Sequence, residues 1–440
     1  MENEILKKKK EPDKENWLIL AHCFNMDGRA ASHTITDKMP YLLGRGILPV
    51  VISAPTGVKD KRFPHFRILS PAPSGILFEM RQIIKRLYPE PVLEKPLKAI
   101  LTILCMPFYL VEKIFFHLDS QWSWFISAVA RGFFIIKKYK PKLIFSSAGP
   151  PSTHIAGYIL HRFFKIPWLV ELYDPLIIDT DSTRSQRYKF KRLIEQMIFK
   201  HADAVIYFTN KALESAERRN VKRNNLNVIR PGAPPEDYSG IEYKKQERIH
   251  FGHFGVLGDG RDLSVIIKVL HDLIREYPAW KNKIILDIYG ASLDSVSRKV
   301  LSEYPLGSVL KEHGRLEYDS VTGKSGRRRV LEAMRRCDIL LLIHGTDIVC
   351  EEFIPSKVYE YLLTDRPIFG MGLPRSELEY LLTQNGHVFS DINNFQKVKN
   401  SIKEFVEEWE HDGLPDNILN TPFTVESYVE KLFKITESIA

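Results

Sequence analysis

Cysteine is scarce in this sequence. The 440 residues include four cysteines, and these are scattered along the chain as Cys23, Cys105, Cys337 and Cys350. Four distant cysteines do not make a disulfide framework, and the absence of a C-x-x-C pair excludes the usual zinc and thiol-exchange motifs. We therefore expect a cytoplasmic protein without cysteine-based redox or zinc chemistry.

Long apolar runs are also lacking. A membrane-spanning helix needs about 18 or more predominantly apolar residues. The nearest approach, Ile100–Val111, is interrupted by Pro107 and followed by Glu112 and Lys113. The first residues carry charge but no apolar segment of the kind that marks a secretory signal. We predict a disordered tail over residues 1–15 and no conventional transmembrane helix.

The positive charge is concentrated in one stretch. The whole chain has 63 Lys+Arg against 54 Asp+Glu, a formal net charge of +9, and residues 59–142 alone have 15 against 6. Large apolar residues are interleaved with these cations, and amphipathic helices of that kind bind anionic membrane surfaces. Two interpretations stay open: a basic amphipathic insertion that lies on a membrane, or a basic helical wall that faces water.

Short apolar runs alternate with helical patterns through both halves of the chain. In the first half we predict strands at Trp17–Ala21, Pro49–Ser53, Leu143–Ser146, Trp168–Leu172 and Ala204–Phe208. In the second half we predict strands at Ile249–Phe254, Ile284–Tyr289, Ile339–Ile343 and Pro367–Phe369. Strands that alternate with helices form parallel sheets with right-handed crossovers. The predicted fold class is therefore α/β, with two doubly wound Rossmann-like domains that face a cleft.

A segment rich in Pro, Gly and Asp, NVIRPGAPPEDYSG, separates the two halves, and its composition is typical of a domain boundary. We predict an N-terminal domain at residues 16–235, a linker at 236–247 and a C-terminal domain at 248–415. A last helix within residues 416–440 is expected to cross back to the N-terminal domain.

A glycine-rich turn follows the first strand of the second half. Gly258, Gly260 and Arg261 precede a helical pattern in which one face is formed by Leu263, Ile266, Ile267, Leu270 and Ile274. Glycines let a bulky ligand approach the backbone, a helix N-terminus attracts an anion, and Arg adds a fixed positive charge. The turn predicts an anion site, with a purely structural turn as the alternative.

Two glutamates, Glu352 and Glu360, are separated by seven residues in the segment EFIPSKVYEY. We expect Ser356 or Pro355 to begin a helix, with Glu352 on the loop before it and Glu360 on its second turn. Carboxylates in those places can accept hydrogen bonds from hydroxyl pairs, while Lys357 and the helix N-terminus face an anion. The alternative for Glu360 is an ordinary exposed helix residue.

Taken together, these motifs resemble the retaining glycosyltransferases of the GT-B type, family four (glycosyltransferase group 1). The resemblance covers nearly the whole chain. It is carried by GRD at a helix start, by the E-x7-E element continued as PSKVYEYLLTDRPIF, and by SSAGPPSTHIAGYIL with IPWLVELYDP. The pattern looks like a bacterial branch that acts in surface-polysaccharide assembly. It implies a GT-B architecture and transfer of a sugar to a glycan or polyprenyl-linked acceptor.

The resemblance implies that the second domain binds a nucleoside-diphosphate sugar as co-substrate, with no other cofactor. Glu352 would then meet the sugar hydroxyls, Glu360 the ribose, and Arg261 with Lys357 the diphosphate. Positive side chains and a helix dipole would replace a metal ion in stabilising the leaving group. The donor-binding residues implied in this way are Gly258, Gly260, Arg261, Gly290, Arg315, Ser356, Lys357 and Glu360, with Gly290 and Arg315 in loops that border the nucleobase.

The first domain would bind the acceptor. Asp27 and Gly28 lie in the loop after the first strand, where family members approach both substrates. His154 and Asp174 follow two neighbouring strands, and with Glu352 they are the candidate catalytic residues. A helix cap or a surface residue is the alternative for His154.

Two other classes of function stay open. A sugar-nucleotide 2-epimerase shares the two-domain architecture but releases an altered sugar without an acceptor. A non-enzymatic protein that binds anionic membrane or nucleic acid would explain the basic stretch. A recognition helix or an aromatic RNA platform is not legible in the sequence, so we expect no nucleic-acid partner. A polyprenyl-linked acceptor would bring the enzyme to the inner face of the plasma membrane as a peripheral protein.

Overall fold

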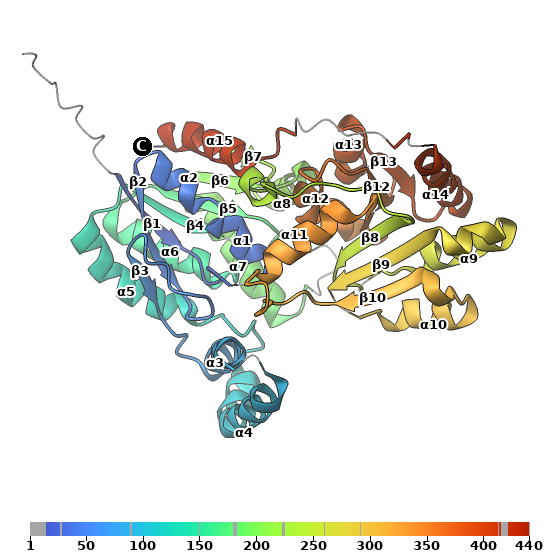
Figure 1. Ribbon diagram of the computed structural model, residues 1–440. Helices are drawn as coiled ribbons and strands as arrows, with labels where there is room; N and C mark the ends of the chain where they lie inside the picture. The colour runs from blue at the N-terminus through green and yellow to red at the C-terminus, as the bar shows by residue number, and fades with distance from the viewer. Residues whose placement is uncertain are drawn as a thin grey trace, which may run out of the picture. The chain divides into compact units, whose positions relative to one another are not determined.

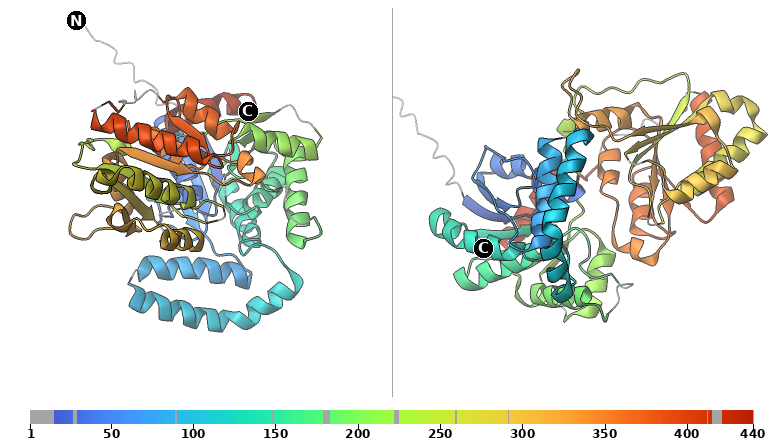
Figure 2. Two further views of the ribbon diagram at one scale, coloured as in Figure 1. Left: turned by 90° about the vertical axis from the view of Figure 1, so that its right-hand side faces the viewer. Right: turned by 90° about the horizontal axis from the view of Figure 1, so that it is seen from below.

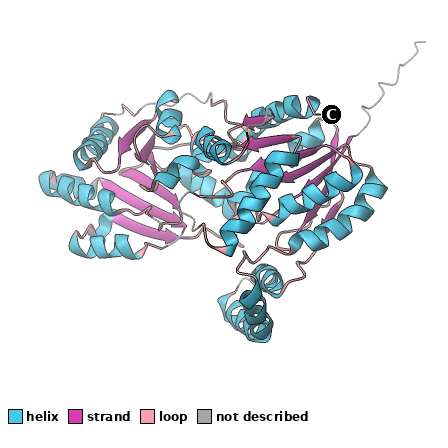
Figure 3. Ribbon diagram, turned by 180° about the vertical axis from the view of Figure 1, so that it is seen from behind, coloured by secondary structure: helices cyan, strands magenta, loops and turns pink. Residues whose placement is uncertain are grey.

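The computed structural model describes residues 15–26, 29–88, 90–147, 149–178, 183–221, 225–258, 260–290, 292–411, 413–414 and 421–439. The chain forms two compact units (Figure 1). The first comprises the described residues of Met1–Tyr207, Leu213–Ile229 and Val429–Ala440, and the second comprises those of Phe208–Ala212 and Arg230–Tyr428. Each unit contains one parallel β-sheet flanked by helices (Figure 3).

The first unit is built on a seven-stranded sheet with the order β3-β2-β1-β4-β5-β6-β7. Its strands are β1 (Glu15–Leu20), β2 (Ile47–Ser53), β3 (His65–Arg67), β4 (Leu143–Ser147), β5 (Trp168–Leu172), β6 (Ala204–Tyr207) and β7 (Leu226–Val228). All paired strands run parallel. The central strands are mostly apolar because helices cover both faces of such a sheet.

Helices connect these strands. They are α1 (Ala30–Thr36), α2 (Met39–Gly44), α3 (Pro73–Leu87), α4 (Pro91–Phe115), α5 (Trp124–Tyr139), α6 (Ser152–Phe164), α7 (Gln186–His201), α8 (Asn210–Arg219) and the C-terminal α15 (Val425–Glu437). The predicted insertion at residues 59–142 forms β3, α3, α4 and α5. The helices α3 and α4 lie alongside each other and project from the sheet (Figures 1 and 2).

The second unit contains a six-stranded sheet with the order β10-β9-β8-β11-β12-β13. The strands are β8 (Ile249–Gly255), β9 (Ile284–Gly290), β10 (Leu310–Gly314), β11 (Ile339–Ile343), β12 (Ile368–Gly372) and β13 (Val388–Asp391). The helices are α9 (Ser264–Glu276), α10 (Ser295–Glu303), α11 (Gly326–Arg336), α12 (Lys357–Tyr361), α13 (Glu377–Gln384) and α14 (Phe395–Glu410), and the 3-10 turns are η1 (Pro235–Tyr238), η2 (Pro278–Asn282), η3 (Gly307–Val309) and η4 (Ile348–Glu352). Both sheets place their first strand inside the sheet, third in the order, and build outward on either side. The predicted α/β class with two doubly wound Rossmann-like sheets is confirmed.

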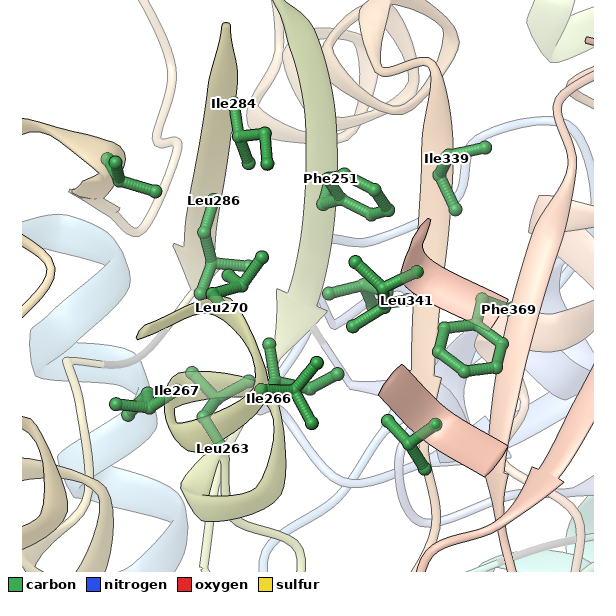
Figure 4. Packing of buried hydrophobic residues seen from close by; sticks show 14 of the residues in the cluster. Phe251, Leu263, Ile266, Ile267, Leu270, Ile284, Leu286, Ile339, Leu341 and Phe369 are labelled. Carbon is green, nitrogen blue, oxygen red and sulfur yellow. The ribbon is translucent and has the colours of Figure 1, made fainter. Parts of the chain in front are cut away.

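The core of the second unit confirms the helical face predicted after the glycine turn. Ile266, Ile267 and Leu270 of α9 are buried against Phe251 of β8 and Leu341 of β11 (Figure 4). A face that repeats every three to four residues is the signature of a helix with one buried side. This packing fixes where α9 begins, and therefore where the preceding glycine turn lies.

The four strands that the sequence analysis missed are β3, β7, β10 and β13, and each is the outermost strand of its sheet. Their side chains are mostly half-buried or exposed, whereas the residues of β4, β5 and β11 are all buried. An edge strand has one neighbour and partial cover, so its sequence lacks the continuous apolar run by which a central parallel strand is found.

The predicted domain limits, 16–235, 236–247 and 248–415, stay predictions about independently folding parts. The predicted tail lies outside the described residues except for Glu15, which begins β1. In the predicted C-terminal segment, residues from Val429 onward group with the first unit, where the Phe433 ring lies 5.4 Å from that of Trp17. Among the described helices, none is long and apolar enough to cross a membrane.

Candidate functional site

A tight glycine turn begins where β8 ends in the second unit. Gly255, Gly258 and Gly260 have φ angles of 122°, 125° and 75°, which residues with a side chain rarely adopt. The turn is closed by two backbone hydrogen bonds between Gly258 and Arg261, of 2.9 and 3.1 Å. Within the described structure no atom lies within 4 Å of the place that a Cβ of Gly258 or Gly260 would take. The backbone there is open to a ligand.

Gly290, at the end of β9, has a structural reason of its own. Its φ is +109°, and a Cβ would lie 2.6 Å from the carbonyl oxygen of Gly255 on the paired strand. The close approach of β8 and β9 therefore requires glycine at this position, with or without a nucleobase nearby.

Arg261 and Lys357 form a pair of neighbouring cations. The Lys357 ammonium donates a hydrogen bond to the carbonyl oxygen of Phe254, the residue before Gly255. Burial, together with the positive charge of Arg261, lowers the pKa of Lys357 to about 8. Among the residues that the structure describes, neither cation makes an ion pair with a carboxylate. Two adjacent, unpaired cations at the carboxyl end of a parallel sheet are suited to an anion.

The two glutamates lie on either side of Ser356, which precedes α12 as predicted. Glu352 is the last residue of η4 rather than part of an open loop, and only 6% of it is exposed. Glu360 lies in the first turn of α12 and not in the second, because this helix has only five residues. Burial raises the pKa of Glu360, and Arg327, 3.5 Å from its carboxylate, opposes that rise.

The anion sites predicted at the helix N-termini stay predictions. A five-residue α12 has a small dipole, because the peptide dipoles that sum along the axis are few. At the start of α9, the Leu263 amide donates to Ser297 Oγ at 2.9 Å and the Ser264 amide donates to Asp262 Oδ1 at 2.8 Å. These two amides have partners within the chain, so the side chains of Arg261 and Lys357 are the stronger candidates for the positive groups that a ligand would meet.

Sequence reasoning missed the residues that hold the Glu352 segment. His344, which follows β11, shares its Nε2 hydrogen between the carbonyl oxygens of Cys350 and Phe353, at 2.7 and 3.1 Å. The Thr209 hydroxyl donates to the backbone oxygen of Glu352 at 2.7 Å, and both partners belong to the second unit. A polar residue directly after an apolar strand, as in LLLIH, is the signal that would have found His344.

Three further residues were implied by the resemblance: Arg315, Asp27 and Gly28. Arg315 is 46% exposed and pairs with Glu317 at 3.3 Å, just after β10. Asp27 and Gly28 lie outside the described residues, so their predicted role has no structural description.

A pocket of about 290 Å³ opens in the first unit at the carboxyl ends of β4 and β5. It brings together His154 and Asp174, the two residues predicted for this half of the chain. Its lining is rich in polar and charged groups, which suits a hydroxyl-rich ligand. The lining residues are Asp119, Gln121, Gly149, Pro150, Pro151, His154, Glu171, Leu172, Tyr173, Asp174, Pro175, Leu176, Arg187 and Lys191.

His154 lies in the first turn of α6 and is almost completely buried, so it is not a surface residue. Burial lowers its pKa to about 3, and the ring is therefore neutral at physiological pH. The Trp168 indole donates to Ser146 Oγ at 2.9 Å, and His154 Nδ1 lies 3.0 Å from the same oxygen. A histidine with so low a pKa is a poor general base at physiological pH.

Asp174 has the opposite character. Its side chain is exposed at the pocket, yet the surrounding protein removes enough hydration to raise its pKa to about 6. A carboxylate that titrates near the operating pH is well suited to accept a proton. Of the two predicted residues, Asp174 is therefore the better proton acceptor.

The base of the pocket contains a buried ion pair that the sequence analysis did not single out. Lys38 donates to Glu171, and Ser147 Oγ donates to the other carboxylate oxygen at 2.7 Å. At the rim, Arg187 pairs with Asp119 at 2.8 Å. A glutamate inside the apolar strand WLVEL is the signal for this pair, because a charge in a buried strand needs a partner.

No group of three or more His, Cys, Asp and Glu side chains that could hold a metal ion occurs among the residues described above.

Comparison with protein families gives one match. Residues 108–232 match the model of the glycosyl transferase 4-like domain. This segment includes α5, β4, α6 and β5, and it contains all the lining residues of the pocket at His154 and Asp174. A search of curated proteins finds no significant match.

Solved structures share the fold over almost the whole chain. Anabaena HepE in complex with UDP is 12% identical, with 97% of this chain and 100% of that chain covered at a TM-score of 0.62. Sucrose-phosphate synthase from Thermosynechococcus elongatus is 13% identical, with 97% and 98% covered at a TM-score of 0.59. The trehalose 6-phosphate synthase of Burkholderia multivorans is 9% identical, with 97% and 99% covered at a TM-score of 0.58. These likenesses show the fold, which is of the GT-B type with two Rossmann-like units, and residues 108–232 are similar to the glycosyl transferase 4-like domain.

Proposed function

We propose that this enzyme transfers a sugar from a nucleoside-diphosphate sugar to a glycan or polyprenyl-linked acceptor, with retention of configuration, in the assembly of a cell-surface polysaccharide. The observation that carries the proposal is the pair of unpaired cations, Arg261 and Lys357, beside an open glycine turn. A sugar nucleotide is the ligand that combines a diphosphate for the cations with hydroxyl pairs for nearby carboxylates.

The second unit is proposed to bind the donor. Arg261 and Lys357 contact the diphosphate, and the backbone at Gly258 and Gly260 lets it approach closely. Glu352 accepts hydrogen bonds from the sugar hydroxyls and Glu360 from the ribose. The HepE structures with UDP and with UDP-glucose support a nucleotide sugar as the ligand class. Further contacts are proposed for Ser356, and for Gly290 and Arg315 around the base.

The first unit is proposed to bind the acceptor in the 290 Å³ pocket. Asp174 accepts a hydrogen bond from the attacking hydroxyl, while neutral His154 forms a hydrogen bond with another acceptor group. The hydroxyl oxygen forms a bond to the anomeric carbon on the face from which the diphosphate leaves. The anomeric carbon–phosphate oxygen bond breaks, and the proton of the hydroxyl passes through Asp174 to the leaving phosphate. Asp27 and Gly28 are proposed to lie beside the acceptor.

The leaving diphosphate gains negative charge as that bond breaks. Preorganised positive groups that meet developing charge stabilise a transition state. Arg261 and Lys357 are fixed by the turn and by the Phe254 carbonyl, so they are in place before the reaction. We propose that they take the role that a metal ion has in other sugar-nucleotide enzymes.

The test is incubation with a panel of UDP-, GDP- and ADP-sugars, with and without a polyprenyl-linked saccharide, read by release of nucleoside diphosphate. Acceptor-dependent release with one donor supports the proposal. An altered sugar nucleotide without any acceptor would identify a 2-epimerase instead. No turnover of any sugar nucleotide, with binding only to membranes or nucleic acid, would favour a non-enzymatic protein. The proposed location is the cytoplasmic face of the membrane that carries the acceptor.

A further inference from the structure

The helix α4 turns its apolar residues outward, which is the reverse of an ordinary surface helix. A helix at the surface of a globular protein buries its apolar face and exposes its polar one. Val92, Ile103, Leu110 and Ile114 are 79%, 72%, 54% and 70% exposed. Their spacings of seven and eleven residues place these four side chains along one line of the helix.

The exposed face of α4 extends over the whole helix. Among the described side chains of α4, Lys95 is the only charged one that is exposed. All the others in the exposed set are apolar: Val92, Leu93, Pro96, Ala99, Ile100, Ile103, Leu104, Met106, Pro107, Phe108, Leu110, Val111, Ile114 and Phe115. A contiguous apolar surface of this extent is rare on a soluble protein and marks an interaction site.

The polar side chains of α4 face the neighbouring helix instead. Glu112 is buried, and its carboxylate accepts hydrogen bonds from the amide and hydroxyl of Ser74, at 2.7 and 2.6 Å. The Arg81 guanidinium of α3 donates to Thr102 Oγ1 at 2.7 Å. These bonds fix the rotation of α4, so the outward direction of its apolar face is built into the fold.

The charges of this hairpin favour an anionic partner. Of the two carboxylates on α4, Glu112 is buried and Glu94 pairs with Lys98, so the only exposed acid beside the described part of this helix is Glu90, which precedes its first residue. Lys95 and Lys113 lie near the two ends of the helix. The hairpin belongs to the stretch at residues 59–142 that holds the whole excess of positive charge.

We propose that α4 lies in the surface of an anionic lipid bilayer, with its exposed apolar face among the acyl chains and its cations at the headgroups. Lipid fits better than a protein partner, because specific protein interfaces carry about one hydrogen bond per 100–200 Å². Apart from Lys95, the described exposed side chains of α4 offer no group for directional contacts. An acyl layer needs none. The inference goes beyond the transfer reaction, because it does not depend on the donor site.

Two of the three basic residues of α3 bond to other parts of the protein in this arrangement. Arg81 bonds Thr102, and Arg86 donates to the carbonyl oxygens of Pro55, Thr56 and Gly57. Both guanidiniums therefore support the fold. The test must change the apolar line of α4 rather than these arginines.

The experiment measures co-sedimentation of the full chain with vesicles of phosphatidylcholine alone and with 30% phosphatidylglycerol, a composition chosen to be about one-third anionic. We expect binding to the anionic vesicles. The variant Ile103→Ser/Leu110→Ser/Ile114→Ser should bind at least about tenfold more weakly, because three side chains lose apolar area that the bilayer would bury. Higher salt should weaken the binding of the parent chain only in part, since screening leaves the apolar contribution intact.

Two controls accompany this variant. Ile103→Leu/Leu110→Ile/Ile114→Leu keeps the face apolar and should bind like the parent chain. Leu193→Ser/Val221→Ser/Val321→Ser removes three residues elsewhere that are 64%, 90% and 92% exposed, and it should also bind like the parent. Circular dichroism checks that each variant folds.

Three outcomes would overturn the proposal. One is equal binding of the parent and the serine variant of α4. Another is the absence of binding to either kind of vesicle. The third is self-association of the parent in sedimentation velocity, abolished by the serine variant, without vesicle binding. That result would assign the face to a second copy of the chain.

Discussion

The two units share one strand order, but the side chains at the carboxyl ends of their sheets are tuned in opposite directions. In the first unit, partial dehydration raises the pKa of Asp174 to about 6. In the second, burial and Arg261 lower the pKa of Lys357 to about 8. Both shifts bring the pKa of an ionisable side chain closer to neutral pH. The same sheet edge can therefore be adapted to accept a proton in one unit and to hold an anion in the other.

The largest effect on this contrast is expected from Asp174→Asn, because the amide that replaces the carboxylate cannot accept a proton. General base catalysis contributes about 10²–10⁴ in rate, so we expect kcat to fall by at least about 10². In the parent enzyme kcat/KM should decline as pH falls below about 6, where the Asp174 carboxylate becomes protonated. The variant should lack that decline. Unchanged kcat and an unchanged acidic limb would remove Asp174 from the reaction.

Arg261→Ala and Glu360→Ala should each weaken donor binding in the second unit. A hydrogen bond to a charged group contributes about 1.5–3 kcal/mol, or roughly 10- to 150-fold in affinity. Calorimetry with the accepted nucleotide sugar measures it, and Glu303→Ala, which changes an exposed residue at the end of α10 outside the proposed site, is the matched control. If both variants bind the donor as the parent does, the assigned donor site is wrong.

The variant Lys357→Arg tests the effect of the Lys357 titration in the second unit. Lys357 is charged below its pKa of about 8 and loses its proton above it, so donor affinity should be full at pH 7 and fall at higher pH. Arginine remains charged throughout this range. The variant should therefore keep its affinity between about pH 7 and about pH 9, values chosen to lie about one unit on either side of the titration. A parallel decline in parent and variant would show that another group titrates.

The smallest expected effect is that of chelation. Activity should be unchanged by EDTA, because we propose that Arg261 and Lys357 provide the positive charge for the leaving diphosphate. The sequence also contains Asp179-Thr180-Asp181, an Asp-x-Asp pattern outside the described residues. Loss of turnover on chelation, restored by magnesium or manganese, would point to these aspartates. The variant Asp179→Asn/Asp181→Asn would then test them directly.

The helices α9 and α4 show how far a hydrophobic pattern predicts structure. Both have an apolar line at helical spacing. The line of α9 is buried against β8 and β11, whereas Ile103 and Ile114 of α4 are about seven-tenths exposed. The spacing identified the helix face in one case and the amphipathic stretch in the other. What covers each face depends on contacts with residues that are distant in the sequence. In α4, the hydrogen bonds from Ser74 to Glu112 orient the helix.

The site was predictable to a similar extent. Glycines with positive φ, the Glu352–Glu360 spacing and the residues after β4 and β5 are visible in the sequence, because they follow strands that are themselves visible. The Lys38–Glu171 pair, whose members are 133 residues apart, was not. Neither was the occupation of the α9 amides by Ser297 and Asp262, because a side chain's partner depends on packing.

The sequence by itself determined the two parallel sheets, their central strands and the position of the glycine turn. These follow from local pattern, since a strand buried on both faces must be apolar and a left-handed turn favours glycine. Only the tertiary structure decided that His154 is neutral, that Asp174 and Lys357 titrate near neutral pH, and that α4 exposes its apolar face. Burial, charge proximity and hydrogen-bond partners set these properties, and all three are fixed by residues distant in the chain.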